Sequence, residues 1–378
     1  MKGTVSAPPS KSELHRLLIC AALSDRETKI ESFSPSGDIT ATLRCLRALG
    51  AEFENDIVTP IRKVPDRALL DCGDSGSTLR FLAPLASALG VEAELRMGEG
   101  LKKRPVGFSL PLTLTGHDFT VDGSLSSQIV SGYLFALTRL GGALTVTGKE
   151  VSGPYIDMTV NTLAEFGASI RREGNRYFME KTCPLRSPGT VRAGGDWSGG
   201  AFLLLAGLIG KTPVTVTGLR EDSTQGDREI VSILRRMGGD LRWEGDGLTA
   251  YPSSLRGIAV SVENIPDLAP VIAVAGAFAE GKTVISGASR LRYKESDRLE
   301  SVCGLIRDLG GKAEADPDGM TIFGGGLRGG IADSRGDHRI AMAAGIAAVG
   351  CREPVTVLGA EAVEKSFPGF WELLEDRT

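Results

Sequence analysis

Residues 196–210 read DWSGGAFLLLAGLIG, and residues 267–281 read DLAPVIAVAGAFAEG. Each stretch begins with an aspartate, a residue type that favours the start of a helix, and then continues almost without polar residues. A helix that is apolar on nearly every face has to be buried on all sides. The two stretches therefore predict two buried helices, and the fold follows from what comes after them.

The same order of elements follows both stretches, which indicates an internal repeat. After each buried helix come a short strand bounded by glycine, a polar loop, an amphipathic helix that ends near glycine, and a hairpin. In the second copy these are residues 282–287, 288–297, 298–311 and 312–323. A third copy starts at Asp337 and stops before any hairpin.

The first half of the chain carries three more copies, which start at Ser10, near Ser75 and at Ser126. In the copy from Ser75 the amphipathic helix and the hairpin are shortened, and Pro105 and Pro111 interrupt the helical pattern. The chain is thus best described as six units of roughly 50 to 70 residues.

The two kinds of helix should pack differently. In the amphipathic helix of residues 298–311 the apolar residues fall on one stripe, so this stripe should face the core and the charges should face water. The stripe consists of Leu299, Val302, Leu305, Ile306 and Leu309. Short strands between such helices suit three units per domain, with helices inside and strands outside.

Two domains are expected from 378 residues. The last copy lacks its final strands, whereas a lone strand at residues 2–7 precedes the first copy. We therefore expect one discontinuous domain, residues 1–9 plus 194–378, and one continuous domain, residues 10–193. The active site is expected in the cleft between them.

The composition restricts the function. With 43 Lys and Arg against 47 Asp and Glu, the net charge of −4 argues against binding to nucleic acid or to an anionic membrane. The six cysteines form no CxxC pair and should be reduced and mostly buried, in a cytoplasmic protein. Only three histidines are present, so we expect no histidine-based metal centre. The apolar runs are too short for a membrane span, and residues 1–12 lack the apolar core of a signal peptide.

Reactive polar residues gather at the starts of the buried helices and in the loops before the amphipathic helices. Lys11 lies in a first helical turn, where the helix dipole disfavours a cation, so we expect an anion to bind there. If the buried helices of each half run parallel, their N-terminal amides converge on one face that can bind several anions.

Each of these residues taken alone favours an ordinary structural role. A serine or aspartate at a helix start is usually a cap, the run KESDR is usually a solvated first turn, and a single DHR is more often structural than catalytic. Their common position within the repeat favours a site instead. A non-catalytic protein that binds anions is the alternative from another class.

The motifs PSKSxxxR, DGSLSSQ, SGPYIDMT, STQGD, RYKESDRL and GDHRIAM occur here in this order. In these motifs, from residue 8 to residue 370, the chain resembles the 5-enolpyruvylshikimate-3-phosphate synthase family of enolpyruvyl transferases. The resemblance implies an α/β fold, a two-domain inside-out α/β barrel with three βαβαββ repeats per domain. It also implies that the 5-hydroxyl of shikimate 3-phosphate attacks phosphoenolpyruvate and that a tetrahedral intermediate then loses phosphate, with neither a metal nor an organic cofactor.

The resemblance also assigns roles to individual residues. The residues implied for phosphoenolpyruvate are Lys11, Gly76, Arg80, Arg104, Gln128, Arg298, Arg339 and Lys365. Those implied for shikimate 3-phosphate are Ser12, Arg16, Ser126, Ser127, Gln128, Ser152, Tyr155, Asp267 and Lys294. Proton transfer falls to Lys11, Asp267 and Glu295. Arg290 stands where some relatives have an asparagine that contacts the shikimate phosphate and can serve that anion, and His338 is a further candidate. Several arginines suit a substrate with a phosphate and a carboxylate, because guanidinium groups pair with both.

The chain departs from the family pattern at one further place, and one rival family has to be considered. Asp74, Ser75, Gly76 and Ser77 stand where many relatives have Asn-Ala-Gly-Thr, which puts a direct ligand contact of Asp74 in doubt; it can cap a helix or pair with an arginine. Gly76 leaves room at the phosphoenolpyruvate site, so we expect sensitivity to glyphosate. The UDP-N-acetylglucosamine enolpyruvyl transferases are the nearest rivals, but they have Lys-Asn where this chain has Lys11-Ser12, and a loop cysteine that is absent from residues 97–107. We expect a monomer.

Overall fold

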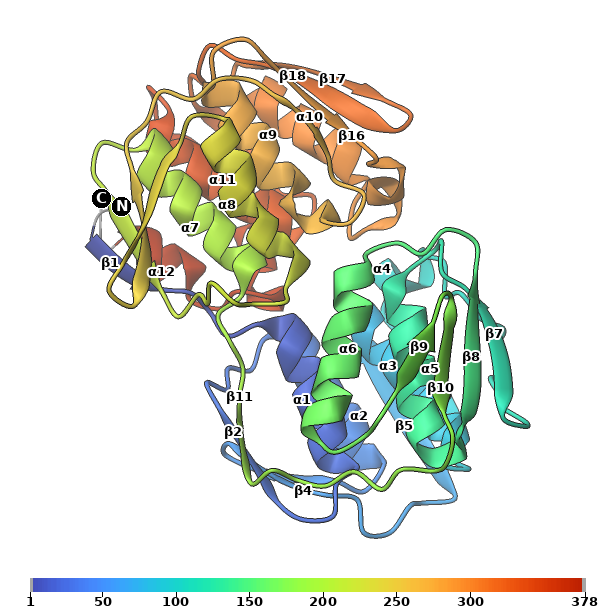
Figure 1. Ribbon diagram of the computed structural model, residues 1–378. Helices are drawn as coiled ribbons and strands as arrows, with labels where there is room; N and C mark the ends of the chain where they lie inside the picture. The colour runs from blue at the N-terminus through green and yellow to red at the C-terminus, as the bar shows by residue number, and fades with distance from the viewer. Residues whose placement is uncertain (1–2, 376–378) are drawn as a thin grey trace. The chain divides into compact units, whose positions relative to one another are not determined.

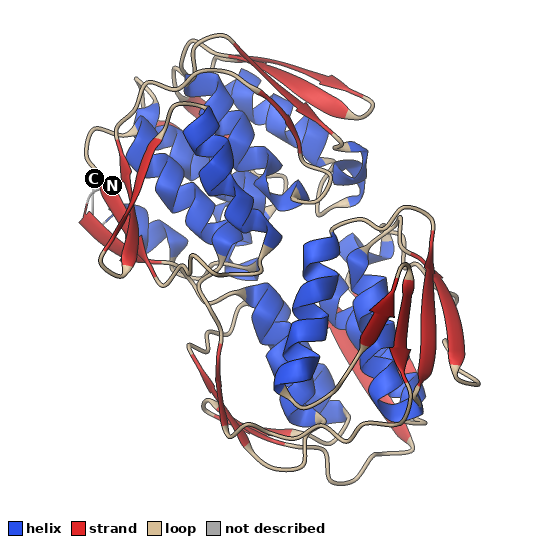
Figure 2. Ribbon diagram, viewed as in Figure 1, coloured by secondary structure: helices blue, strands red, loops and turns tan. Residues whose placement is uncertain are grey.

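The computed structural model describes residues 3–375. The chain divides into two compact units: unit 1 is Met1–Pro8 with Gly194–Thr378, and unit 2 is Pro9–Ala193. In Figure 1 unit 2 runs from blue to green, and unit 1 runs from yellow-green to red together with the first strand. Within each unit the helices lie inside and the strands lie at the periphery (Figure 2).

Three buried helices form the centre of unit 1, as the sequence predicts. They are α7 (Trp197–Ile209), α9 (Ala269–Phe278) and α11 (His338–Gly350). Aspartates begin two of them: Asp196 accepts a hydrogen bond from the Gly199 amide at 2.9 Å, and Asp337 accepts one from the Arg339 amide at 2.9 Å. A short 3₁₀ turn, η2 (Pro266–Leu268), leads into α9.

The outer helices of unit 1 include the predicted amphipathic ones. They are α8 (Ile230–Arg236) and α10 (Arg298–Asp308), preceded by the 3₁₀ turns η1 (Gly226–Glu229) and η3 (Ser289–Tyr293). The expected stripe of α10, from Leu299 to Leu309, is buried, which confirms the prediction. After α11 come η4 (Ala360–Lys365) and α12 (Phe370–Glu375).

The strands of unit 1 form three separate sheets, in the orders β1-β12-β14-β13, β15-β16-β18-β17 and β19-β20. The strands are β1 (Gly3–Ser6), β12 (Val214–Thr217), β13 (Asp240–Glu244), β14 (Gly247–Tyr251), β15 (Ala259–Ser261), β16 (Lys282–Ser286), β17 (Lys312–Asp316), β18 (Gly319–Phe323), β19 (Gly330–Asp333) and β20 (Val355–Leu358). Strand β1 pairs in parallel with β12, with Gly3 opposite Val214. The first strand therefore completes a sheet of the unit formed by the second half of the chain.

Unit 2 repeats this plan with its own helices. The buried helices are α1 (Lys11–Ala22), α3 (Gly76–Ala88) and α5 (Ser127–Leu140), and the others are α2 (Gly37–Ala48), α4 (Glu99–Lys102) and α6 (Gly153–Glu165). The three buried helices start where the sequence predicts. Ser10, Ser75 and Ser126 are their N-caps, and each side chain accepts a hydrogen bond from a backbone amide of the first turn.

The sheets of unit 2 have the orders β11-β2-β4-β3, β7-β8-β10-β9 and β5-β6. The strands are β2 (Thr28–Glu31), β3 (Glu52–Glu54), β4 (Ile57–Thr59), β5 (Arg67–Gly73), β6 (Glu92–Met97), β7 (Asp118–Asp122), β8 (Gly142–Thr147), β9 (Arg171–Glu173), β10 (Arg176–Met179) and β11 (Thr190–Arg192). Each four-stranded sheet has one parallel pair that is continued by an antiparallel hairpin.

The repeat from Ser75 is the shortened one, as predicted. Its second helix, α4, has four residues, and its sheet has only the parallel pair β5-β6. Between α4 and β7 the chain forms an irregular segment, residues 103–117, with a cis peptide bond between Leu110 and Pro111. Proline at residues 105 and 111 excludes the regular helix that follows the strand in the other repeats.

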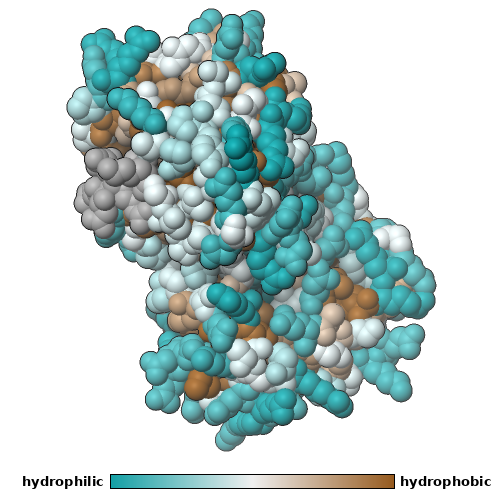
Figure 3. All heavy atoms as spheres, turned by 60° about the vertical axis from the view of Figure 1, so that its left-hand side comes forward, coloured by the Kyte–Doolittle hydropathy of each residue, from teal (hydrophilic) through white to brown (hydrophobic). Residues whose placement is uncertain are grey.

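The apolar residues divide between two cores, one in each unit. Figure 3 shows hydrophilic side chains over most of the visible face, with hydrophobic atoms in small separate areas. All six cysteines are free thiols and four of them are buried, which confirms the expectation from their spacing. Within residues 3–375, none of the helices has the length and hydropathy that crossing a membrane requires.

Candidate active site

Four predicted residues of unit 2 meet where α3 and α5 begin. Arg80 donates to the Gln128 side-chain oxygen at 2.9 Å, and the side-chain amide nitrogen of Gln128 donates to the Ser77 hydroxyl at 2.9 Å. Gly76 lies among them: a Cβ at this residue would be 2.6 Å from Arg80 Nη1, 3.5 Å from Gln128 Oε1 and 3.8 Å from Arg104 Nη1. We call Gly76, Arg80, Arg104 and Gln128 the basic cluster.

Arg80 also fixes the segment that follows α4. Its Nε donates to the Val106 carbonyl at 3.2 Å, and its Nη2 donates to the Pro105 carbonyl at 2.5 Å. Arg104 lies just before these residues and donates to the Gly100 carbonyl at 3.2 Å. The shortened repeat therefore retains the arginine of its loop, held close to the start of α3.

Lys11, where we expect an anion to bind, pairs with a carboxylate of the chain itself. Its ammonium lies 2.7 Å from Asp38 Oδ2, and Asp38 is a buried residue in the first turn of α2. The Thr78 hydroxyl donates to the Asp38 carbonyl at 3.4 Å, which connects this pair to the start of α3. Asp38 was not among the candidate residues. Its sequence context, an acid in a first helical turn, is that of any dipole-stabilising side chain.

Arg16 is 2% exposed and connects α1 with α5 and α6. It donates to the Ser12 carbonyl at 2.6 Å, to the Tyr155 carbonyl at 2.8 Å and to the Thr159 hydroxyl at 2.8 Å. Burial lowers the pKa of this guanidinium to about 10. The structure thus brings Ser12, Arg16 and Tyr155 together, with protein acceptors around the arginine.

The remaining candidates of unit 2 lie at helix starts. The Ser126 hydroxyl accepts a hydrogen bond from the backbone amide of Gln128 at 3.2 Å, and Ser127 is the buried first residue of α5. Ser152 precedes α6 with φ of 53°, a left-handed conformation that is costly for a residue with a side chain. Such strain concentrates at functional sites, which agrees with the expected role of Ser152.

In unit 1 three acidic and three basic residues meet around the starts of α9, α10 and α11. Arg298 is central: Nε lies 2.7 Å from Asp337 Oδ2, Nη1 lies 2.8 Å from Asp267 Oδ1, and Nη2 lies 2.6 Å from Glu295 Oε2. Asp267 also lies 3.3 Å from the Lys294 ammonium and 3.5 Å from Arg339 Nη2. We call Asp267, Lys294, Glu295, Arg298, Asp337 and Arg339 the carboxylate cluster.

The charges of this cluster support one another. Burial acts to lower the pKa of Arg298, but Asp337, Glu295 and Asp267 outweigh it, so the pKa is raised. Burial lowers the pKa of Lys294, and Asp267 only partly opposes this. Asp267 is the one member whose carboxylate is substantially accessible, with 28% of its side chain exposed beside three cations. This makes Asp267 a carboxylate that can meet a substrate.

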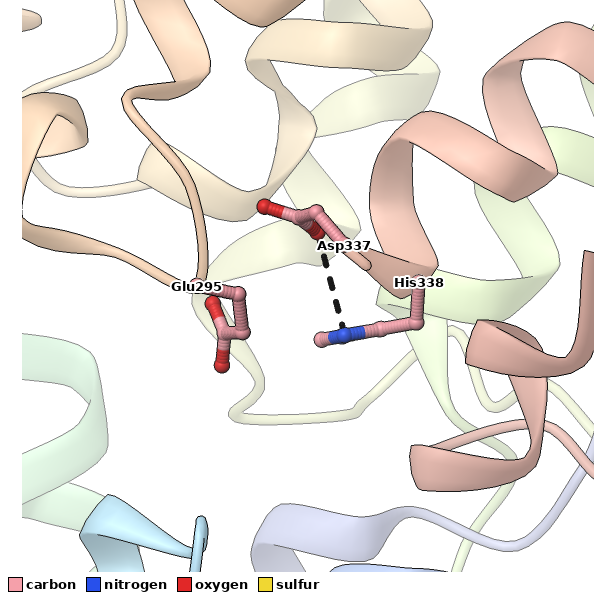
Figure 4. Close-up of side chains that lie close together, drawn as sticks. All are labelled: Glu295, Asp337 and His338. Carbon is pink, nitrogen blue, oxygen red and sulfur yellow. Dashed lines mark ion pairs between the residues drawn. The ribbon is translucent and has the colours of Figure 1, made fainter. Parts of the chain in front are cut away.

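His338 lies beside Asp337, with its Nδ1 3.8 Å from Asp337 Oδ1 (Figure 4). One ligand atom each from Glu295, Asp337 and His338 lie within 4.8 Å of one another, a spacing that could hold a cation. The guanidinium of Arg298, however, contacts both carboxylates. A metal ion would have to displace that buried arginine, so the donor set does not fit a metal.

A second buried carboxyl group lies close to this cluster. Asp227, from the motif STQGD, accepts a hydrogen bond from the Ser198 hydroxyl at the start of α7. Burial, followed by the charge of Asp267, raises the pKa of Asp227 to about 7. Gln225 of the same motif accepts from the Trp197 amide at 3.0 Å, so the motif fixes the start of α7. Asp227 was not predicted as a site residue, although its motif carried the resemblance.

Two candidates lie at the edge of these contacts. Arg290, in η3, donates to the Glu263 carbonyl, and burial lowers its pKa. Lys365 is the last residue of η4 and is partly buried.

The fold and the two clusters define an α/β enzyme built from repeats, with cations and carboxylates at the starts of its buried helices. The family model described as EPSP synthase (3-phosphoshikimate 1-carboxyvinyltransferase) matches residues 1–112 and 107–374. The chain belongs to the EPSP synthase family.

Individual relatives agree with this assignment. The 3-phosphoshikimate 1-carboxyvinyltransferase of Clostridium novyi is 36% identical over 414 positions, covering 99% of this chain and 95% of the relative. That of Clostridium kluyveri is 38% identical, covering 98% and 94%. The EPSP synthase structure from Acinetobacter baumannii has a TM-score of 0.80 at 27% identity, covering 99% and 95%. An alignment of 414 positions exceeds the 378 residues of this chain, and the family match is divided at residues 107–112, in the shortened repeat.

Proposed function

We propose that the chain transfers the enolpyruvyl group of phosphoenolpyruvate to the 5-hydroxyl of shikimate 3-phosphate and releases phosphate. The observation that carries this proposal is Asp267, a partly exposed carboxylate held by Lys294, Arg298 and Arg339 in a member of the EPSP synthase family. The basic cluster and the carboxylate cluster would act on the same pair of substrates.

Phosphoenolpyruvate would be held by cations. Lys11, Arg104, Arg298, Arg339 and Lys365 would pair with its phosphate and carboxylate, and Gly76 and Gln128 would leave room and donate a hydrogen bond. Arginine suits this role because its planar fork of donors matches both groups. Arg80 donates to Gln128 and to two loop carbonyls, so we assign it to holding the basic cluster in place.

Shikimate 3-phosphate would lie against the starts of α1, α5 and α6. The hydroxyls of Ser12, Ser126, Ser127, Ser152 and Tyr155, with Gln128 and Lys294, would bind its phosphate and hydroxyl groups. Arg16, buried against Ser12 and Tyr155, would set their positions. Arg290 stays a further candidate for the phosphate.

Proton transfer would divide between carboxylates and Lys11. A hydroxyl is a poor nucleophile and needs a positioned base, which we assign to Asp267. Lys294, Arg298 and Arg339 hold this carboxylate in place, where it would take the proton of the 5-hydroxyl. Lys11 and Glu295 would deliver protons to the enol methylene and to the leaving phosphate, and His338 stays a further candidate near Glu295.

No second copy of the chain is needed for these roles, and a monomer would suffice. The six free thiols support a reducing compartment, the cytoplasm.

The test is phosphate release from phosphoenolpyruvate by the purified protein without divalent metal. Shikimate 3-phosphate and UDP-N-acetylglucosamine would be compared as acceptors. We expect release only with shikimate 3-phosphate. Release only with the nucleotide sugar would assign the chain to the rival transferases, and no release with either would favour an anion-binding protein without activity.

A further inference from the structure

Asp74 lies in the turn between β5 and α3, and its carboxylate faces the short helix α4. We propose that Asp74 is a positioning residue whose carboxylate holds the first turn of α4, so that Arg104 stays beside Gly76 in the basic cluster. This inference rests on the proposed function, which assigns Arg104 to phosphoenolpyruvate.

Hydrogen bonds join Asp74 to the residues around α4. Asp74 Oδ1 accepts from the Leu101 amide at 2.8 Å, and the Asp74 carbonyl accepts from Arg104 Nη2 at 3.2 Å. A third contact, from the Gly98 amide to the Gly73 carbonyl at 2.8 Å, lies immediately beside them. The turn before α3 therefore holds α4 at its first residues and holds Arg104 at its side chain.

Gly98, just before α4, and Gly100, within it, allow this close approach. A Cβ at Gly98 would be 2.5 Å from Asp74 Oδ1, and a Cβ at Gly100 would be 3.0 Å from the same atom. Side chains at these two residues would push the carboxylate away from the Leu101 amide. The two glycines in the sequence GEG at residues 98–100 thus leave the space that the Asp74 carboxylate occupies.

The connection from Leu101 to Arg104 is short. The Arg104 amide donates to the Leu101 carbonyl at 3.1 Å, and Arg104 Nε donates to the Gly100 carbonyl at 3.2 Å. Leu101 itself is fully buried, which fixes the far side of the turn. A displacement of this turn therefore moves the guanidinium that lies next to Gly76.

A four-residue helix cannot hold its own conformation, because forming the first turn of a helix is unfavourable. The other repeats of this chain have a longer second helix, with more residues packed on the core. In the shortened repeat, α4 ends at Lys102 and the irregular segment follows. The Leu101 amide also donates to the Gly98 carbonyl at 3.1 Å, but the cap residue Gly98 has no side chain, so the carboxylate of Asp74 supplies the side-chain acceptor at this helix start.

Capping of α3 does not explain Asp74. Ser75 already caps α3 by accepting from the Thr78 amide at 3.3 Å. The carboxylate instead reaches a different element, one that carries a predicted substrate residue. An asparagine at this place offers an acceptor oxygen of the same geometry, so the contact requires the oxygen and not the charge.

The first experiment measures kcat and the KM values of both substrates for Asp74→Ala and Asp74→Asn. For Asp74→Ala we expect the KM for phosphoenolpyruvate to rise about tenfold, with the KM for shikimate 3-phosphate within about twofold of wild type. Asp74→Asn should restore the wild-type KM. Glu92→Ala is the control, because Glu92 is an exposed carboxylate that lies 2.8 Å from Arg67 and should leave both KM values unchanged.

Three outcomes would overturn the proposal. These are an unchanged KM for phosphoenolpyruvate in Asp74→Ala, an equal rise in both KM values, or an Asp74→Asn variant as impaired as Asp74→Ala. Gly98→Ala provides a second variant if Asp74→Ala does not fold. It should raise the same KM value by displacing the carboxylate.

Hydrogen exchange at the Leu101 amide tests the contact without any activity. We expect faster exchange at Leu101 in Asp74→Ala and wild-type exchange in Asp74→Asn. Unchanged exchange in Asp74→Ala would overturn the proposed contact. Inactivity of the wild type with both substrates, together with the expected exchange, would reject the proposed function and keep the contact.

Discussion

The basic cluster of unit 2 and the carboxylate cluster of unit 1 hold their arginines in different ways. In unit 1, Arg298 contacts three carboxylates and Arg339 contacts one of them. In unit 2, Arg80 donates to uncharged acceptors, the backbone carbonyls of Gly76, Pro105 and Val106 and the Gln128 side-chain oxygen. Arg80 therefore fixes the neutral groups around the start of α3, whereas Arg298 and Arg339, which we propose to pair with phosphoenolpyruvate, also fix the carboxylates around them.

Lys11, by contrast with Arg80, pairs with a carboxylate, Asp38. Replacing Lys11 tests whether a cation is needed there for catalysis. Lys11→Met should lower turnover by about 10⁴-fold, because the change removes both a proton carrier and a charge. Phosphate release measures the loss. Lys29→Met is the control, since Lys29 is exposed and lies 3.7 Å from Asp56; turnover near the wild-type rate in Lys11→Met would contradict the assignment.

Asp267 is the corresponding test in unit 1. Asp267→Asn keeps the shape and removes the base, so kcat should fall about 10³-fold while the fold is retained. Steady-state assays of phosphate release measure kcat, and circular dichroism measures whether the fold is retained. Asp222→Asn, an exposed carboxylate paired with Arg220, should behave like wild type. A fall in kcat of less than about tenfold would assign the base elsewhere.

Arg298 tests the stability of the carboxylate cluster. Its side chain is 2% exposed, and Arg298→Met leaves Asp337, Glu295 and Asp267 without their shared cation. We expect a loss of about 3 kcal/mol in the free energy of unfolding, because an uncompensated buried charge is costly. Denaturant unfolding measures it, and Arg242→Met, at an exposed ion pair, should change little. Equal stability of both variants would show that the cluster contributes nothing to folding.

The free energy of unfolding should depend on pH through Asp227. Its pKa is raised to about 7 in the folded chain from 3.8, so the folded state binds more protons than the unfolded state between these values. The stability from this group is therefore full below about pH 4 and falls as the pH rises toward 7. Asp227→Asn cannot titrate, so its melting temperature relative to wild type should rise by a few degrees from pH 5 to pH 8. A difference in melting temperature between Asp227→Asn and wild type that stays constant or falls from pH 5 to pH 8 would contradict the raised pKa of Asp227.

The smallest expected effect is at Gly76. A methyl group there would meet Arg80 Nη1, the end of a flexible side chain, so the arginine can shift. Gly76→Ala should raise the KM for phosphoenolpyruvate by about tenfold or less and weaken inhibition by glyphosate. The wild type should be sensitive to glyphosate. Millimolar resistance of the wild type with normal substrate affinity would contradict the role of Gly76.

The sequence predicted best what depends on local periodicity. The buried helices, their serine and aspartate caps, and the shortened repeat at Ser75 follow from apolar patterns and proline positions. The motifs also placed Asp267, Glu295, Arg298 and Arg339 near helix starts, and the structure brings these four residues together.

What the sequence did not predict depends on pairing between distant segments. Asp38 is 27 residues from Lys11, and nothing in its own context distinguishes it from an ordinary helix-start acid. Asp74 lies directly before the serine that caps α3, yet its carboxylate serves α4, 27 residues further along the chain. Such contacts depend on how the repeats pack against one another. The periodicity of apolar residues within one segment does not reveal that packing.

The shortened repeat also matters for protein engineering. Relatives carry additional residues, and the family match divides in the irregular segment after α4. Residues 109, 110, 111 and 113 are exposed in this irregular segment, and exposed loops tolerate insertion. Residues 109–113 are therefore a natural place to insert a peptide tag or a fluorescent reporter, whereas Pro105 and Val106, bound to Arg80, should be left intact.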